Sequence, residues 1–166
     1  MNNLTILIAI FFLGVPLASW SPASNGATFK GAWFEVWVPP AFTAIPSTKS
    51  RSAGEGVDSA FFRSPDQQVE FYVFSPQWNT EPHEIALNAA TEKLSVTETK
   101  RAGSKRITSY TIQAKDGSYA RSYQDTSSAV ENARLVFGIK YANQSVYNRY
   151  KDAYLKFRKS LRQFAD

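Results

Sequence analysis

The chain contains no cysteine, one histidine and one methionine among its 166 residues. The absence of cysteine excludes disulfides, iron–sulfur clusters, thiolate zinc sites, thiol catalysis and a lipid-modified cysteine anchor. A single histidine excludes a metal site built from several histidines of one chain. Because 43% of the residues are apolar and 14% are aromatic, the chain has enough core material to fold without such cross-links.

Charged residues are missing from the start of the chain, where the first is Lys30. Residues 4–15 (LTILIAIFFLGV) form an apolar run that Pro16 ends, and this run is shorter than the roughly 20 residues that span a membrane. Small residues typical of the cleavage zone of a secretory signal follow it, namely Ala18, Ser19, Ser21, Ala23 and Ser24. We therefore expect residues 1–23 to be a signal peptide and the protein to be periplasmic or secreted, with no stable membrane span after the leader is removed. An uncleaved N-terminal anchor and a buried first strand are the alternatives.

Residues 24–166 are about the length of one domain. Strand patterns recur along them without the alternation of strand and helix that a parallel sheet requires. The expected strands lie at 33–38, 59–62, 69–74, 94–100, 106–114, 118–124 and 134–141. The segment 69–74 (VEFYVF) is apolar on both sides apart from Glu70, so we expect it in the middle of an antiparallel sheet that is covered on both faces.

Turns and loops separate these strands. Ser64-Pro65-Asp66 predicts a turn, and Asp116-Gly117 predicts a tight hairpin. Residues 43–58 are small and polar, which indicates a loop. Residues 75–92 are ambiguous, because a short helix beginning near Thr80 and a loop fit them equally well.

Large apolar side chains near the end of the chain follow a helical spacing. They are separated by 3, 4, 3, 4 and 3 positions and therefore form one stripe, made of Tyr147, Tyr150, Tyr154, Phe157, Leu161 and Phe164. Asn143, Gln144 and Ser145 supply residues that cap a helix N-terminus. The sequence therefore predicts an α+β fold, in which this long C-terminal helix packs on a twisted antiparallel sheet.

Sequence motifs of nucleophilic, phosphate-binding, dinucleotide-binding and zinc-protease sites are absent from the chain. His83, which stands between Glu81 and Glu84, is a possible general base or single metal ligand, although an exposed surface histidine is the commoner case. The carboxylates are scattered without the spacing of a calcium loop. We therefore predict no catalytic residue, no metal site and no cofactor.

Two glutamates lie inside aromatic strand segments. Glu35 and Glu70, on neighbouring strands, would form the acid–base pair that glycosidases use. The more frequent arrangement is that each pairs with a lysine or arginine. The pair defines the alternative hypothesis of a small envelope hydrolase.

Aromatic residues suggest a binding surface. Tyr119, Arg121 and Tyr123 alternate along one strand and therefore share a face, which we expect to point outward or into a groove, since arginine seldom enters a core unpaired. Trp33 and Trp37 share a face in the same way, although packing in the core is the favoured interpretation for them. Exposed rows of this kind stack on sugars, aromatic ligands or proteins.

Three segments resemble the PsbP-like fold family, which joins lumenal photosystem subunits, a Ran-binding nuclear factor and small exported bacterial proteins. Residues 33–42 (WFEVWVPPAF) are similar to the opening strand of that family, residues 59–74 resemble its early hairpin, and residues 134–164 resemble its closing strand and helix. The resemblance implies an α/β/α sandwich and an adaptor or binding role. It carries over no metal or partner residue.

Taken together, these patterns favour an exported, non-enzymatic binding or accessory protein of the cell envelope. The expected partner is another envelope protein or a glycan, and not a nucleic acid. A sugar- or peptidoglycan-binding module that uses Tyr119, Arg121 and Tyr123 is a further alternative.

Overall fold

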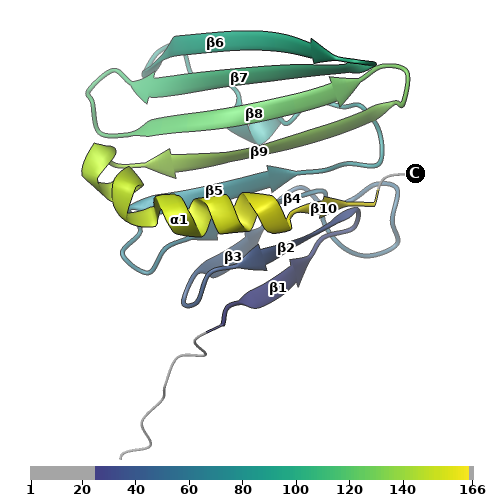
Figure 1. Cartoon of the computed structure of the whole chain (residues 1–166), viewed down its shortest axis with the longest axis horizontal. Helices are drawn as coiled ribbons and strands as arrows, with labels where there is room; N and C mark the ends of the chain where they lie inside the picture. The colour runs from purple at the N-terminus through teal and green to yellow at the C-terminus, as the bar shows by residue number, and fades with distance from the viewer. Residues whose placement is uncertain (1–24, 165–166) are drawn as a thin grey trace, which may run out of the picture.

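The structure is a computed structural model that describes residues 25–164, and the expected signal peptide lies outside them. Two antiparallel sheets and one long helix, α1 (Gln144–Ser160), make up the fold (Figure 1). In spatial order, the seven-stranded sheet contains β3 (Thr43–Pro46), β4 (Ser59–Arg63), β5 (Val69–Phe74), β9 (Ala133–Tyr141), β8 (Ala120–Ser128), β7 (Lys105–Ala114) and β6 (Glu92–Ala102). The three-stranded sheet contains β1 (Ala27–Lys30), β2 (Phe34–Val38) and β10 (Arg162–Gln163). The fold is therefore α+β with a mainly antiparallel sheet, as predicted.

The strand β5 lies in the interior of the large sheet, between β4 and β9. Val69, Phe71 and Val73 point to one face and contribute to the larger core, whereas Tyr72 and Phe74 point to the other face and its smaller core. This two-sided burial is what the apolar pattern of residues 69–74 predicts. The turn before β5 is also as expected, because the amide of Gln67 donates to the carbonyl of Ser64 over 2.9 Å.

Both hairpins that join β6, β7 and β8 are built on glycines with positive φ. Gly103 (φ +59°) opens a two-residue loop, since Ala102 and Lys105 are the last paired residues of β6 and β7. The second hairpin has a longer loop than predicted, because the amide of Ala114 still bonds the carbonyl of Tyr119. Gly117 lies in this four-residue loop with φ +75°, a backbone conformation that residues with a Cβ rarely adopt.

The helix α1 begins at its predicted cap. The side chain of Asn143 accepts a hydrogen bond from the amide of Val146 over 3.0 Å, which satisfies one free donor of the first turn. The helix ends at Ser160, earlier than the periodicity predicts. The chain then becomes extended and pairs with β2 as β10, so Phe164 lies outside the helix and is 43% exposed. The predicted stripe is therefore wrong at its last position.

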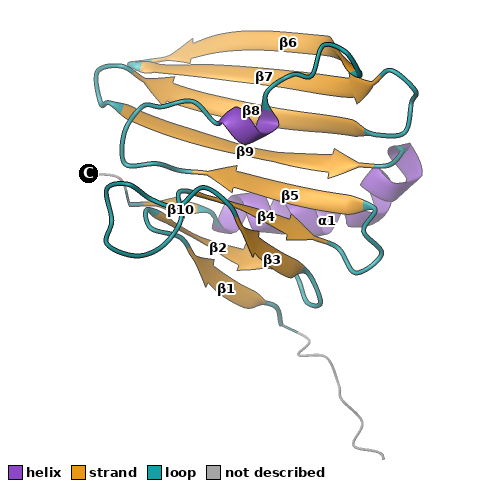
Figure 2. Cartoon of the chain, turned by 180° about the vertical axis from the view of Figure 1, so that it is seen from behind, coloured by secondary structure: helices purple, strands orange, loops and turns teal. Residues whose placement is uncertain are grey.

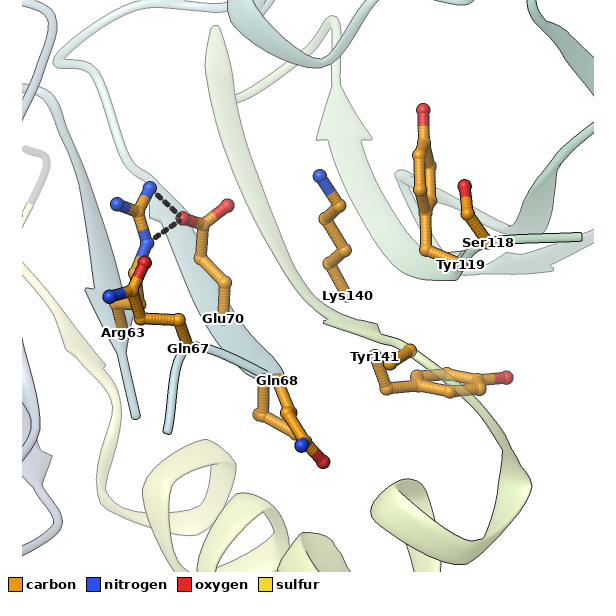
Figure 3. Close-up of a pocket in the computed structure, with 10 residues that line it drawn as sticks. Arg63, Gln67, Gln68, Glu70, Ser118, Tyr119, Lys140 and Tyr141 are labelled. Carbon is orange, nitrogen blue, oxygen red and sulfur yellow. Dashed lines mark hydrogen bonds and ion pairs between the residues drawn. The ribbon is translucent and has the colours of Figure 1, made fainter. Parts of the chain in front are cut away.

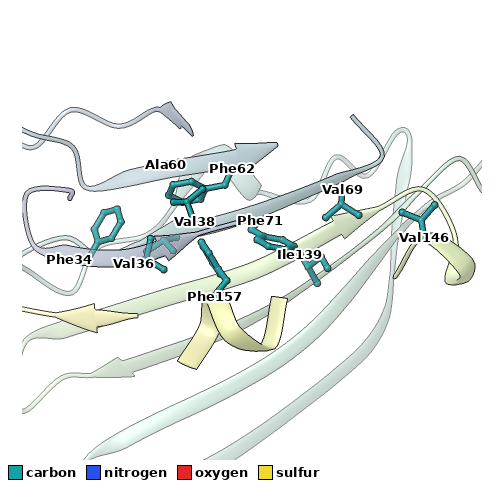
Figure 4. Close-up of a cluster of buried hydrophobic side chains, with 11 residues drawn as sticks. Phe34, Val36, Val38, Ala60, Phe62, Val69, Phe71, Ile139, Val146 and Phe157 are labelled. Carbon is teal, nitrogen blue, oxygen red and sulfur yellow. The ribbon is translucent and has the colours of Figure 1, made fainter. Parts of the chain in front are cut away.

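The larger core lies between the large sheet, α1 and the small sheet (Figure 4). Phe157 of α1 is fully buried and its ring packs 5.2 Å from Phe62 and 5.0 Å from Phe71, measured between ring centroids. Phe34 and Val36 of β2 enter the same core. The small sheet and α1 thus share one face of the large sheet.

The opposite face of the large sheet is covered by the segment 75–92, which holds the single 3-10 turn η1 (His83–Ile85) (Figure 2). Ile85 is buried there with Tyr72, Phe74, Tyr123 and Val136. The ambiguous segment is therefore mostly an extended loop. A three-residue turn occupies the place of the second helical layer that the resemblance implies.

Three short strands were not expected from the sequence. Residues 43–58 are predicted as a loop, yet they include β3 and a bridge between Lys49 and Val57. The strands β1 and β10 are too short for a periodic signal, and pairing with β2 defines them. Within residues 25–164, no helix combines the length and the apolar character that crossing a membrane requires.

Candidate functional site

The side chains of Tyr119, Arg121 and Tyr123 lie on the face of the large sheet that η1 covers. Arg121 and Tyr123 are each only 7% exposed, whereas Tyr119, just before β8, is half-buried. The expectation of an outward-facing row is therefore wrong for Arg121 and Tyr123. All three side chains do line a hollow in that face, which is the groove alternative of the prediction.

Arg121 is buried because it binds the segment above it. Its guanidinium forms an ion pair with Glu92, with Nε 2.7 Å from Oε1 and Nη2 2.5 Å from Oε2. Nη1 and Nη2 also donate to the carbonyl oxygens of Ile85 and Ala86 over 2.7 and 3.0 Å. The guanidinium therefore ties the end of the 75–92 segment to β8, and its donors are engaged inside the protein.

Glu92 has an unusually acidic carboxyl group. The hydrogen bonds from Arg121, supported by the amide of Asn88 and the hydroxyl of Tyr119, lower the pKa of Glu92 to about 2 against the burial that would raise it. In return, the bond to Glu92 raises the pKa of the Tyr119 hydroxyl. This carboxylate is charged at neutral pH and is not suited to be a proton donor.

Tyr123 is buried against a glycine on the neighbouring strand. Gly138 lies opposite Tyr123, and a Cβ on it would lie 2.1 Å from the tyrosine ring and 2.5 Å from the carbonyl oxygen of Ser122. The ring also packs edge-on against Tyr72 with centroids 5.9 Å apart. Tyr123 is therefore mainly a core residue, and only its small exposed part lines the hollow.

A row of charged residues crosses the same face. The register of the sheet places Arg63, Glu70, Lys140 and Arg121 directly opposite one another on β4, β5, β9 and β8. Arg63 and Glu70 form an ion pair at 2.7 Å, as Figure 3 shows. The Nζ of Lys140 lies 4.2 Å from the centroid of the Tyr119 ring, and no carboxylate of residues 25–164 approaches this ammonium group within 4.0 Å.

Two adjoining hollows share Glu70, Tyr119 and Lys140. One has a volume of about 300 Å³ and is lined mainly by polar side chains, including those of Arg63, Gln67, Gln68, Ser118 and Tyr141 (Figure 3). The other has a volume of about 340 Å³ and reaches under the 84–92 segment to Arg121 and Glu92. Amides, hydroxyls, an ammonium group and aromatic rings give these hollows the chemistry of a polar-ligand site.

The two glutamates of the hydrolase hypothesis lie apart in the topology. Glu35 is on β2 of the small sheet and Glu70 is on β5 of the large one, so they are not on neighbouring strands. Glu35 accepts a hydrogen bond from Arg162 over 2.8 Å, and Glu70 is held by Arg63. Each carboxylate thus has the arginine partner that the sequence suggested as the commoner arrangement.

His83 is exposed on η1, and residues 25–164 contain no group of three or more acidic or histidine side chains suited to hold a metal. Its neighbour Glu84 accepts hydroxyl hydrogen bonds from Thr48, Ser59 and Tyr72. Burial works to raise the pKa of Glu84, but these donors outweigh it and the pKa lies below its ordinary value. Periodicity offers no signal for such a cluster, because its donors come from three separate segments.

Trp33 and Trp37 are both half-buried and use their indole N–H groups inside the protein. Trp33 precedes β2 and its indole N–H donates to Ser52 over 2.8 Å. Trp37 donates to the backbone oxygen of Asn25 over 2.8 Å, and the ammonium group of Lys156 lies 3.9 Å from its ring. Trp37 also packs at the margin of the larger core, as the favoured interpretation predicts.

No protein-family model and no curated protein sequence matches the chain. Among solved structures, the chain is similar to the solution structure of cyanobacterial PsbP (CyanoP) from Synechocystis sp. PCC 6803, with a TM-score of 0.51. The alignment covers 95% of this chain and 99% of that one at 10% sequence identity, a level that informs on the fold alone. The chain has a PsbP-like fold.

Proposed function

We propose that the chain is an exported, non-enzymatic binding or accessory protein of the cell envelope, and that it binds its ligand in the two hollows around Tyr119 and Lys140. The ligand is a polar molecule with an anionic group, carried by a glycan or by another envelope protein. The leader-like residues 1–23 support a periplasmic or secreted location.

One observation carries the choice of site. Lys140 points into the hollow beside Tyr119 (Figure 3), and its ammonium group lacks a carboxylate partner in the part of the chain that the structure describes. An anionic ligand group would supply that partner, and the half-buried Tyr119 ring would contact the body of the ligand.

The chemistry of the acids supports binding rather than catalysis. Glu35, Glu70 and Glu92 are all engaged by arginines. Arg121 stabilises the Glu92 carboxylate in its charged form, which disfavours the protonated state that a general acid needs.

The experiment measures how the protein is retained by purified peptidoglycan and which proteins it captures from an envelope extract. Lys140→Gln and Tyr119→Ala should each reduce retention of the same ligand about tenfold, because each removes one of the two contacts. Tyr119→Phe, which keeps the ring, should retain binding.

Lys151→Gln on the exposed surface of α1 is the matched control for loss of one charge. If Lys140→Gln binds every fraction as well as the wild type does, the hollow is not the ligand site. Hydrolysis of peptidoglycan by the wild type that Glu70→Gln abolishes would establish the hydrolase alternative instead.

A further inference from the structure

The two edges of the large sheet are protected very differently. The β3 edge is a four-residue strand that ends in Pro46, which has no backbone N–H to donate. The β6 edge is eleven residues long, contains no proline, and has a single irregularity between Leu94 and Val96. Short strands, prolines, bulges and charged side chains, especially lysine, are the usual means of preventing an edge from pairing. β6 carries charged side chains, such as Lys93 and Lys100, but most of it lacks the other three.

The strand β6 also extends beyond the layers that cover the rest of the sheet (Figures 1 and 2). Lys93, Leu94 and Ser95 and all residues from 97 to 102 are exposed. Among residues 25–164, its only paired neighbour is β7, so one row of its backbone donors and acceptors faces outward.

An apolar cleft lies beside this edge on the η1 face. It has a volume of about 350 Å³, and its apolar lining includes Ile85, Leu87, Leu94, Tyr110 and Ile112. Leu87 and Leu94 remain 45% and 50% exposed. An extended peptide alongside β6 would therefore place an apolar side chain on Leu87 and Leu94.

Two arginines mark the other end of the same face. Arg101 and Arg106 lie directly opposite each other beside the Gly103 turn, in line with the Thr97–Tyr110 pair that borders the cleft. The nearby Lys100 and Lys105 contact Glu98 and Glu131, but no carboxylate of residues 25–164 lies within 4.0 Å of either arginine. Like charges directly across a strand pair destabilise it, so an acidic group between them would be favourable.

From these features we infer that β6 binds an extended acidic segment of a partner protein by β-strand addition. The outward row of β6 supplies main-chain hydrogen bonds, the cleft takes an apolar side chain, and Arg101 with Arg106 takes carboxylates. Ile112 and Arg106 are six residues apart on β7, which is about 20 Å along a strand. The segment therefore carries its acids about six residues from its apolar anchor.

The test uses the full chain and two fluorescent peptides of about ten residues, long enough to reach from the cleft to the arginines. In both peptides valine and threonine alternate, and a leucine stands near one end. At the other end, the glutamate peptide has two glutamates and the lysine peptide has two lysines. The glutamate peptide should bind at least about tenfold more tightly than the lysine peptide. Hydrogen exchange should show that it protects amides of β6.

Charge reversal at both arginines, Arg101→Glu with Arg106→Glu, should reverse this preference. Lys151→Glu with Lys159→Glu on α1 is the matched control and should preserve it, since both positions are exposed and belong to another element. Alternate amides of an extended peptide point to opposite edges, and only one edge can pair with β6. N-methylation of the amides on the pairing edge of the glutamate peptide should abolish binding, whereas N-methylation of the amides on the other edge should not.

Three results would overturn the inference. The first is that the wild type binds the two peptides with equal affinity, or that the wild type and the arginine variant bind the glutamate peptide with equal affinity. The second is binding that tolerates both N-methylated versions. The third is protection of β6 amides in a dimer without any peptide, which would assign the edge to a second copy of the chain.

Discussion

At the scale of single residues, the same charged side chain can be a ligand contact or a structural tie, and burial decides between them. The sequence predicts that Arg121 binds a partner. In the structure its guanidinium donates hydrogen bonds to Glu92 and to the carbonyl oxygens of Ile85 and Ala86. Lys140, directly opposite Arg121 on β9, is the cation that remains available in the hollow. Sequence alternation places both side chains on one face but does not indicate which of them is neutralised.

The Arg121–Glu92 pair predicts an acid-sensitive contribution to stability. The folded-state pKa of Glu92, about 2, lies below the ordinary value of 4.5, so the contribution is complete above about pH 4.5 and is lost as the pH falls toward 2. Glu92→Gln should therefore lower the free energy of unfolding by about 3 kcal/mol at pH 7. Urea unfolding of both proteins between pH 7 and pH 2 measures this difference. It should shrink as the pH falls, and a difference that is constant with pH contradicts the assignment.

At the scale of elements, the sequence predicts mainly the strands and the helix that have a long hydrophobic pattern and that pack against other elements. Of the seven strands from β2 to β9 other than β3, all except β6 pack along most of their length or pair on both sides, and these strands and α1 have recognisable periodicity. The exposed edge strand β6 is recognisable instead from its alternation and from the turn at Gly103 that follows it. By contrast, β1, β3 and β10 are at most four residues long, and pairing with a longer neighbouring strand defines them. The early end of α1 has the same cause, because pairing of β10 with β2 replaces the last helical turn.

Docking of α1 depends on one side chain more than on the others. Phe157 is fully buried between α1 and the large sheet, so Phe157→Ala should destabilise the protein by about 3–5 kcal/mol through lost contacts and a cavity. Lys159→Ala is the better control than Lys156→Ala, since Lys156 lies over the Trp37 ring. Thermal unfolding of the three variants compares them. Similar losses from Phe157→Ala and Lys159→Ala would mean that the helix is not docked through this ring.

At the scale of the whole molecule, both proposed binding features lie on the η1 face of the large sheet. The other face is closed by α1 and the small sheet over β5 and its neighbours, whereas the segment 75–92 leaves the hollows around Lys140 and the cleft beside β6 open. The hydrophobic pattern predicts that the sheet has two covers. It does not predict that one cover is closed and the other leaves hollows open. The path of the loop 75–92 depends on single hydrogen bonds, such as that from Tyr72 to Glu84, and these produce no periodic pattern in the sequence.

We expect the mature chain to begin no later than Asn25. The indole N–H of Trp37 donates to the backbone oxygen of Asn25, and Gly26 packs so closely on the same ring that a Cβ there would lie 2.4 Å from it. Residues from Asn25 onward are thus part of the folded structure, while the small residues from Ala18 to Ser24 match a cleavage zone. Cleavage should therefore occur between Ala18 and Asn25, which leaves the Trp37 contact intact. Intact-mass measurement of the exported protein locates the new N-terminus; a chain that still begins at Met1, or one that begins after Asn25, contradicts this prediction.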